Sequence, residues 1–122
     1  MQEDLASTQL WKTRVKFYEE LVSEYDFKFQ PMVNLVKNLS SSEYAKVFFP
    51  TTSHDKLIIS KEPRLYEKWN KVSVVVIGYL PKQGQFTLEY WNKDKKESEQ
   101  TCTEDDIFSK AEALLLRLNL QA

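Results

Sequence analysis

The chain has 122 residues, is 42% hydrophobic and 13% aromatic, and carries a formal net charge of −1. This length suits one domain, residues 1–122, and the composition excludes a wholly disordered chain. With one histidine (His54), one cysteine (Cys102) and two glycines, the sequence is poor in the residues from which most catalytic, metal and cofactor sites are built.

Apolar residues at helical spacing predict a first helix from Asp4 or Ser7 to Tyr25. Acidic residues before it, with Ser7 as a cap, suit a helix N-terminus, where bare backbone amides favour acceptors. Pro31 then fits the first turn of a short second helix, which ends at the serines of residues 40–42. In the first of these two helices, the apolar residues at helical spacing are Trp11, Val15, Tyr18, Val22 and Tyr25.

From residue 44 the pattern changes to runs of β-branched and aromatic residues separated by turn-forming residues. A hairpin loop is expected at Thr51–Asp55, a type I turn at Pro81–Gly84 and a longer link at Glu62–Asn70. The runs predict four strands and a polar fifth edge strand, at Ala45–Phe49, Lys56–Ser60, Val72–Leu80, Gln85–Asn92 and Glu97–Thr101.

A last helix is predicted from Glu104 to Leu120, capped by Thr103 and Asp106. Its apolar face is predicted to consist of Ile107, Ala111, Leu114, Leu115 and Leu118. The expected fold is therefore α+β: an N-terminal helix plus a short helix, a four- to five-stranded antiparallel meander, and a C-terminal helix.

The run from Val72 to Ile77 is apolar on both faces, which favours a central strand. Antiparallel sheets commonly leave one face uncovered, and two or three helices suffice for one face only. We therefore expect Trp91, and with it Phe48, to lie on the other face, where a partner would cover them.

Residues 53–55 contain the three residue types of a hydrolase triad, Ser53, His54 and Asp55. A triad needs side chains that converge from separate segments, so three consecutive residues fit a turn better. His54 and Cys102 lack the companions of a metal site, and the acidic cluster at residues 104–106 suits a helix N-terminus. We expect no enzyme, no cofactor and no metal.

Charge is distributed unevenly along the chain. Residues 44–96 carry ten basic and five acidic side chains, whereas the segments on either side are net acidic. Lysines with interleaved aromatics are typical of single-stranded nucleic-acid binders, although lysines also protect sheet edges from aggregation. The candidate binding residues are Lys61, Arg64, Lys68, Trp69, Lys71, Trp91, Lys93, Lys95 and Lys96.

The sequence favours a non-enzymatic binding module that contacts a protein, either a second copy of itself in a homodimer or a different partner that it serves as subunit or regulator. The contact surface would be the uncovered aromatic face of the sheet. The alternative is single-stranded nucleic-acid binding through residues 61–96. The acidic N-terminus resembles no secretory signal and no apolar run is long enough to span a membrane, so we expect a cytoplasmic protein without a membrane partner.

Overall fold

The computed structural model describes residues 2–25, 28–63 and 71–121. Its elements confirm the α+β class. In chain order they are α1 (Gln2–Tyr25), α2 (Gln30–Ser40), the 3₁₀ helix η1 (Glu43–Lys46), β1 (Phe49–Ser53), β2 (Lys56–Ser60), β3 (Val74–Leu80), β4 (Gln85–Asn92), β5 (Lys95–Cys102) and α3 (Glu104–Gln121).

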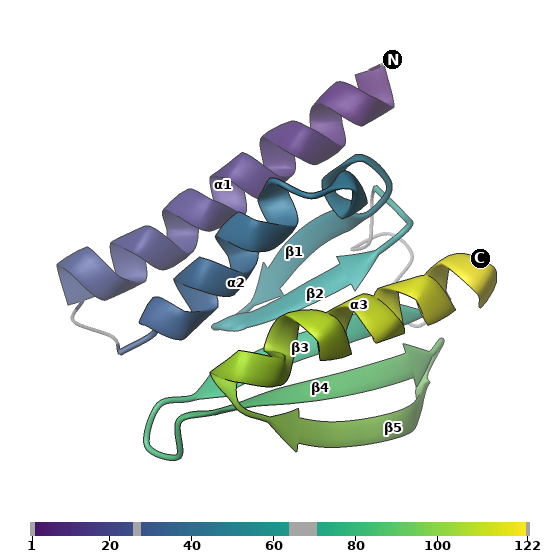
Figure 1. Cartoon of the computed structure of the whole chain (residues 1–122). Coiled ribbons are helices and arrows are strands. Elements are labelled where there is room, and N and C mark those ends of the chain that lie inside the picture. The colour runs from purple at the N-terminus through teal and green to yellow at the C-terminus, as the bar shows by residue number, and fades with distance from the viewer. Residues whose placement is uncertain (1, 26–27, 64–70, 122) are drawn as a thin grey trace.

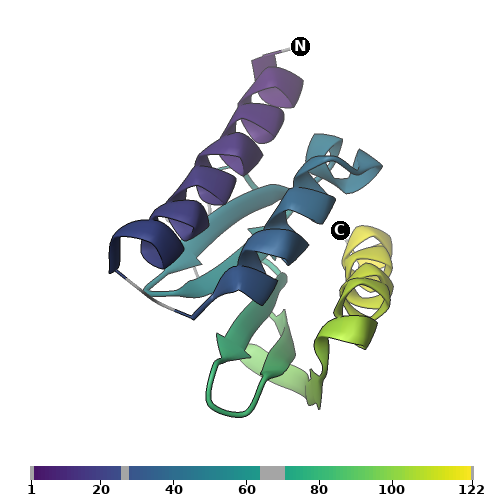
Figure 2. The same cartoon turned by 60° about the vertical axis from the view of Figure 1, so that its left-hand side comes forward.

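The five strands form one antiparallel meander in the order β1-β2-β3-β4-β5. All three α-helices lie on the same face of this sheet, with α1 and α2 over β1 and β2 and α3 over β3 and β4 (Figures 1 and 2). The strand order follows from the sequence because short turns join all neighbouring strands except β2 and β3. The one-sided helices follow because the inward side chains of β2, β3 and β4 are apolar.

The main core lies between the sheet and the helices. Trp11 and Tyr18 of α1 are fully buried, and each also donates a hydrogen bond to the sheet side of the molecule. The Trp11 indole nitrogen donates to the Phe48 carbonyl at 3.0 Å, and the Tyr18 hydroxyl donates to the Asp55 carbonyl at 3.0 Å. These bonds fix α1 against both ends of β1. The sheet contributes Leu57, Ile59, Val75, Ile77, Phe86, Leu88 and Tyr90.

The third helix and the 3₁₀ helix are joined by a hydrogen bond. The Tyr44 hydroxyl donates to Glu112 Oε2 of α3 at 2.5 Å. This hydrogen bond, with a smaller contribution from burial, raises the pKa of Tyr44 to about 12. The phenol therefore stays protonated, and it remains a donor, across the physiological pH range.

The predicted strand at Ala45–Phe49 is wrong, because residues 43–46 form η1 and β1 begins only at Phe49. The Ser42 hydroxyl accepts from the Tyr44 amide and caps this helical turn. The run was too short for its spacing to distinguish a strand from a helical turn. The loop expected at Thr51–Asp55 is mostly strand as well, and the turn is only His54 and Asp55.

Phe48 also differs from expectation. It was predicted to accompany Trp91 on the uncovered face, but it is 2% exposed and belongs to the main core. Ser7 is not a helix cap either, because α1 begins five residues earlier and Ser7 is buried within it.

Other predicted elements are confirmed. Pro31 lies in the first turn of α2, α3 begins at Glu104, and the β3–β4 turn ends at Gly84, whose φ of 64° suits glycine. The predicted edge strand exists and is longer than expected, from Lys95 to Cys102. The longer link expected at Glu62–Asn70 falls largely on residues outside the described part of the chain.

The inner face of α3 provides a direct test of the core. Leu115 is fully buried, so Leu115→Ala should lower the free energy of unfolding by roughly 2–5 kcal/mol through lost transfer energy and a cavity. Leu116 is the matched control, because its side chain is half exposed and Leu116→Ala should cost less than about 0.5 kcal/mol. Urea unfolding measures both values, and equal losses would contradict the assigned orientation of α3.

Candidate functional site

The candidate site is the face of the sheet opposite α1, α2 and α3. No helix in the described part of the chain covers it, and we call it the helix-free face. Residues paired across neighbouring strands share a face, so the register defines its membership. On this face β3 contributes Val74, Val76 and Gly78. The other strands contribute Phe49, Thr51, Ser53, Lys56, Ile58, Ser60, Thr87, Glu89, Trp91, Lys96, Glu99 and Thr101.

A second apolar cluster occupies the centre of the helix-free face. Ile58 and Val74 are 4% and 9% exposed, and Val72, Val76 and Trp91 pack against them and are only partly buried. The prediction that Trp91 lies away from the helices is confirmed. Its indole nitrogen donates to Glu89 Oε1 at 2.8 Å, so its one polar atom has a partner within the face.

Charged side chains beside this cluster are paired with one another. Lys96 Nζ lies 2.9 Å from Glu99 Oε1 and 3.9 Å from Glu89 Oε2. The hydrogen bond to Glu99 raises the pKa of Lys96. Lys96, one of the predicted binding lysines, is therefore engaged within the sheet and is less available to an anionic ligand.

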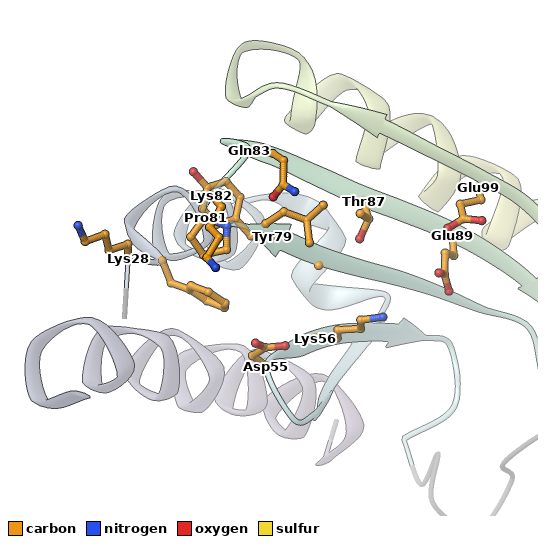
Figure 3. A pocket seen from close by; sticks show the side chains of 13 residues that line it. Lys28, Asp55, Lys56, Tyr79, Pro81, Lys82, Gln83, Thr87, Glu89 and Glu99 are labelled. Carbon is orange, nitrogen blue, oxygen red and sulfur yellow. The ribbon is translucent and has the colours of Figure 1, made fainter. Parts of the chain in front are cut away.

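A shallow depression of about 800 Å³ opens where the helix-free face meets the turns at one end of the sheet. Gly78 forms part of its floor, and the Lys56 side chain passes over it. Figure 3 shows that Lys28, Lys56 and Lys82, which come from three different segments, point in different directions. The lysines therefore do not converge on one point, as a dedicated anion site would require.

Four predicted binding lysines lie together at the opposite end of the sheet. Lys61 follows β2, Lys71 precedes β3, and Lys93 and Lys95 belong to the β4–β5 turn and the start of β5. All four are exposed, and Lys61 Nζ donates to Asn119 of α3 at 3.0 Å. We call these four residues the basic end. The predicted residues Arg64, Lys68 and Trp69 fall outside the described part of the chain.

The edges of the sheet are poorly suited to strand addition. Pro50 lies within β1 and lacks an amide donor, while β5 carries four charged side chains in its first five residues. Proline and charge on an edge strand both discourage pairing with another chain. Contacts with a partner would therefore use a face of the molecule more readily than an edge.

The residues considered for catalysis are not brought together. His54 is exposed in the β1–β2 turn and Cys102 is buried at the end of β5. Three strands separate them, a distance of roughly 15–20 Å at the usual strand spacing. Burial raises the pKa of the Cys102 thiol, which disfavours a reactive thiolate. Within the described residues no group of three or more His, Cys, Asp or Glu side chains could hold a metal ion.

Two features of α3 were missed by sequence reasoning. Arg117 of α3 forms an ion pair with Glu97 of β5, and its Cζ lies 4.0 Å from the centre of the Tyr90 ring. Glu97 itself has no partner in β4, because the register between β4 and β5 shifts there. Leu116 and Leu120 are exposed although they belong to a leucine-rich helix. Their positions, four residues apart and off the core stripe, were the available signal.

Comparisons with protein-family models, with curated proteins and with solved structures gave no match to this chain. No helix among the described residues combines the length and the apolar character that a membrane crossing requires.

The floor of the depression gives a prediction about stability. A Cβ added to Gly78 would lie 2.9 Å from Thr87 Oγ1, which is too close for both atoms to keep their positions. Gly78→Ala should therefore destabilise the protein. In a Thr87→Ala background the same change should raise the free energy of unfolding by about 0.5–1 kcal/mol, because alanine is less costly than glycine within a strand. Thermal or urea unfolding of the four variants measures the sign, and a loss in both backgrounds would contradict this contact.

Proposed function

We propose that this chain is a non-enzymatic binding module that contacts a protein through the helix-free face of its sheet. The observation that carries the proposal is the one-sided position of the described helices, which leaves the partly buried Val72, Val76 and Trp91 on the opposite face, around the buried Ile58 and Val74. An apolar patch surrounded by polar residues is typical of an interaction surface, and tryptophan is enriched among residues that dominate binding energy.

The polar groups around the cluster suit burial against a partner. The Trp91 N–H is satisfied by Glu89, and Lys96 is paired with Glu99 and Glu89. Desolvating a polar group costs most when it loses its only partner, so these internal contacts lower the cost of covering the face. The proline and the charges on the two edge strands also favour a contact made by the face.

A second candidate function, single-stranded nucleic-acid binding, is supported by the basic end. Four exposed lysines from three segments gather there, and Trp91 lies on the neighbouring part of β4. Lysines that follow a phosphate backbone, with an aromatic ring for stacking, are the usual arrangement for such binding. The pairing of Lys96 and the partial burial of Trp91 make this the weaker of the two candidates.

The first test uses Trp91→Glu, which places a charge at the edge of the apolar cluster. Immobilised wild-type protein should retain a specific protein from an extract of its cells, and Trp91→Glu should lose it because a buried, unpaired carboxylate is costly. Thr13→Glu is the matched control, because it adds the same charge on the exposed side of α1. Circular dichroism verifies that both variants are folded. Retention of the same partner by Trp91→Glu would contradict the proposed surface.

Salt dependence separates the two candidates. If each of the four lysines of the basic end contacted one phosphate of labelled oligo-dT, raising the salt from roughly 50 to 200 mM should lower the affinity by about 50-fold, because each contact releases a counterion. We expect no such binding. Steep, salt-dependent binding that is lost when the four lysines of the basic end are changed to alanine would favour the nucleic-acid function over the protein-binding one.

A further inference from the structure

The sheet has a notch beside the depression, because β3 extends further than β2 at this end. The β3–β4 ladder runs to Leu80, whereas the β2–β3 ladder ends where Leu57 pairs with Ile77. Within the described part of the chain, Tyr79 and Leu80 therefore pair with β4 alone. Unlike the edge strands β1 and β5, this short open stretch of β3 lies in the middle of the sheet and carries neither a proline nor a charge.

The backbone of Tyr79 faces the notch. The Leu80 carbonyl accepts from the Gly84 amide at 2.9 Å, so the peptide groups of Leu80 face the β4 side. Successive residues of a strand direct their N–H and C=O groups to opposite neighbours. Tyr79 therefore directs both groups to the side that β2 leaves open, as Ile77 does two residues earlier toward β2 itself. Tyr79 also lines the depression, so a segment bound there can reach these groups without displacing a strand.

The charges around the depression favour an acidic occupant. Two of its acidic side chains, Glu89 and Glu99, are paired with Lys96, which leaves Asp55 as the other acid that lines it. Three exposed lysines line it as well, and none forms an ion pair with a described residue: Lys28, Lys56 and Lys82. The positive charge that is available to a ligand therefore exceeds the negative charge.

The spacing of these lysines suits an extended chain. Because they point in different directions, they do not suit one anion, but they suit several carboxylates spaced along one segment (Figure 3). Successive side chains of an extended segment point to opposite faces, so such a segment would present acids to both sides of the notch.

We propose that the depression binds an extended acidic segment of a partner protein, which pairs its backbone with Tyr79 and directs its carboxylates to Lys28, Lys56 and Lys82. Main-chain pairing of this kind supplies affinity, and the side chains on either side supply specificity. The inference rests on the proposed function, because the depression adjoins the helix-free face and would extend the contact made there.

The first test uses a fluorophore-labelled peptide of sequence EEVEE and measures its anisotropy at about 50 mM salt, where exposed charges are weakly screened. We expect saturable binding. The uncharged peptide QQVQQ should bind about ten-fold more weakly, because the exposed ion pairs are lost. An EEVEE peptide with an N-methylated valine should also bind several-fold more weakly, because it cannot donate to the Tyr79 carbonyl.

Protein variants locate the site. Lys28→Gln/Lys56→Gln/Lys82→Gln should weaken EEVEE binding about ten-fold through the loss of the same ion pairs. The matched control is a variant that removes an equal charge from the basic end and should bind as the wild type does: Lys61→Gln/Lys71→Gln/Lys93→Gln. Circular dichroism verifies that both variants are folded.

Three results would overturn the proposal: no binding of EEVEE up to about 5 mM, binding that is insensitive to the peptide's charge or to N-methylation, or equal loss in the two lysine variants. Trp91→Glu should still bind the peptide, because Trp91 pairs with Val74 at the other end of β3. Failure of this inference is therefore distinguishable from failure of the proposed protein contact, which the Trp91→Glu retention experiment tests separately.

Discussion

The side chains of β3 alternate between two environments, and this alternation divides the molecule into two chemically different halves. Val75 and Ile77 pack beneath the helices in the main core, whereas Val74 and Val76 belong to the smaller cluster on the other face. Because the period of a strand is two, a slip of one residue would exchange the two sets. The long ladder with β4, from Val74 opposite Trp91 onward, holds the register. The position of every other surface depends on it.

One surface for a partner follows from this division. The helix-free face has paired charges and an apolar centre, which suits a contact that covers a flat sheet. Leu116 and Leu120 are exposed on α3, which covers the other face of the sheet, so they take no part in that contact.

Periodic patterns predicted the long elements well, because each helix and central strand repeats its apolar spacing several times. The short region before β1 was misassigned, because its few apolar residues fit the spacing of a strand and of a helix equally well. The hydroxyl of Ser42 caps the first turn there and favours the helical conformation. Lys61, Lys71, Lys93 and Lys95 gather at one end because the meander, which the sequence predicted, places the end of β2, the start of β3 and the β4–β5 turn at the same end of the sheet. The outward leucines of α3 were visible in the sequence, but the prediction included only those on the core stripe.

The central claim is that, in the described part of the chain, helices cover one face of the sheet and no helix covers the other. Thiol accessibility measures this directly in a Cys102→Ala background, where either Val75→Cys or Val76→Cys supplies the only cysteine of the chain. Cys102 is replaced because the native thiol would otherwise react on unfolding. A thiol at position 76 should react with a maleimide in the folded protein without unfolding, although more slowly than in the unfolded chain, because Val76 is only partly buried. A thiol at position 75 should react only through unfolding, and therefore far more slowly. Equal protection at the two positions, or faster reaction at position 75, would contradict the account.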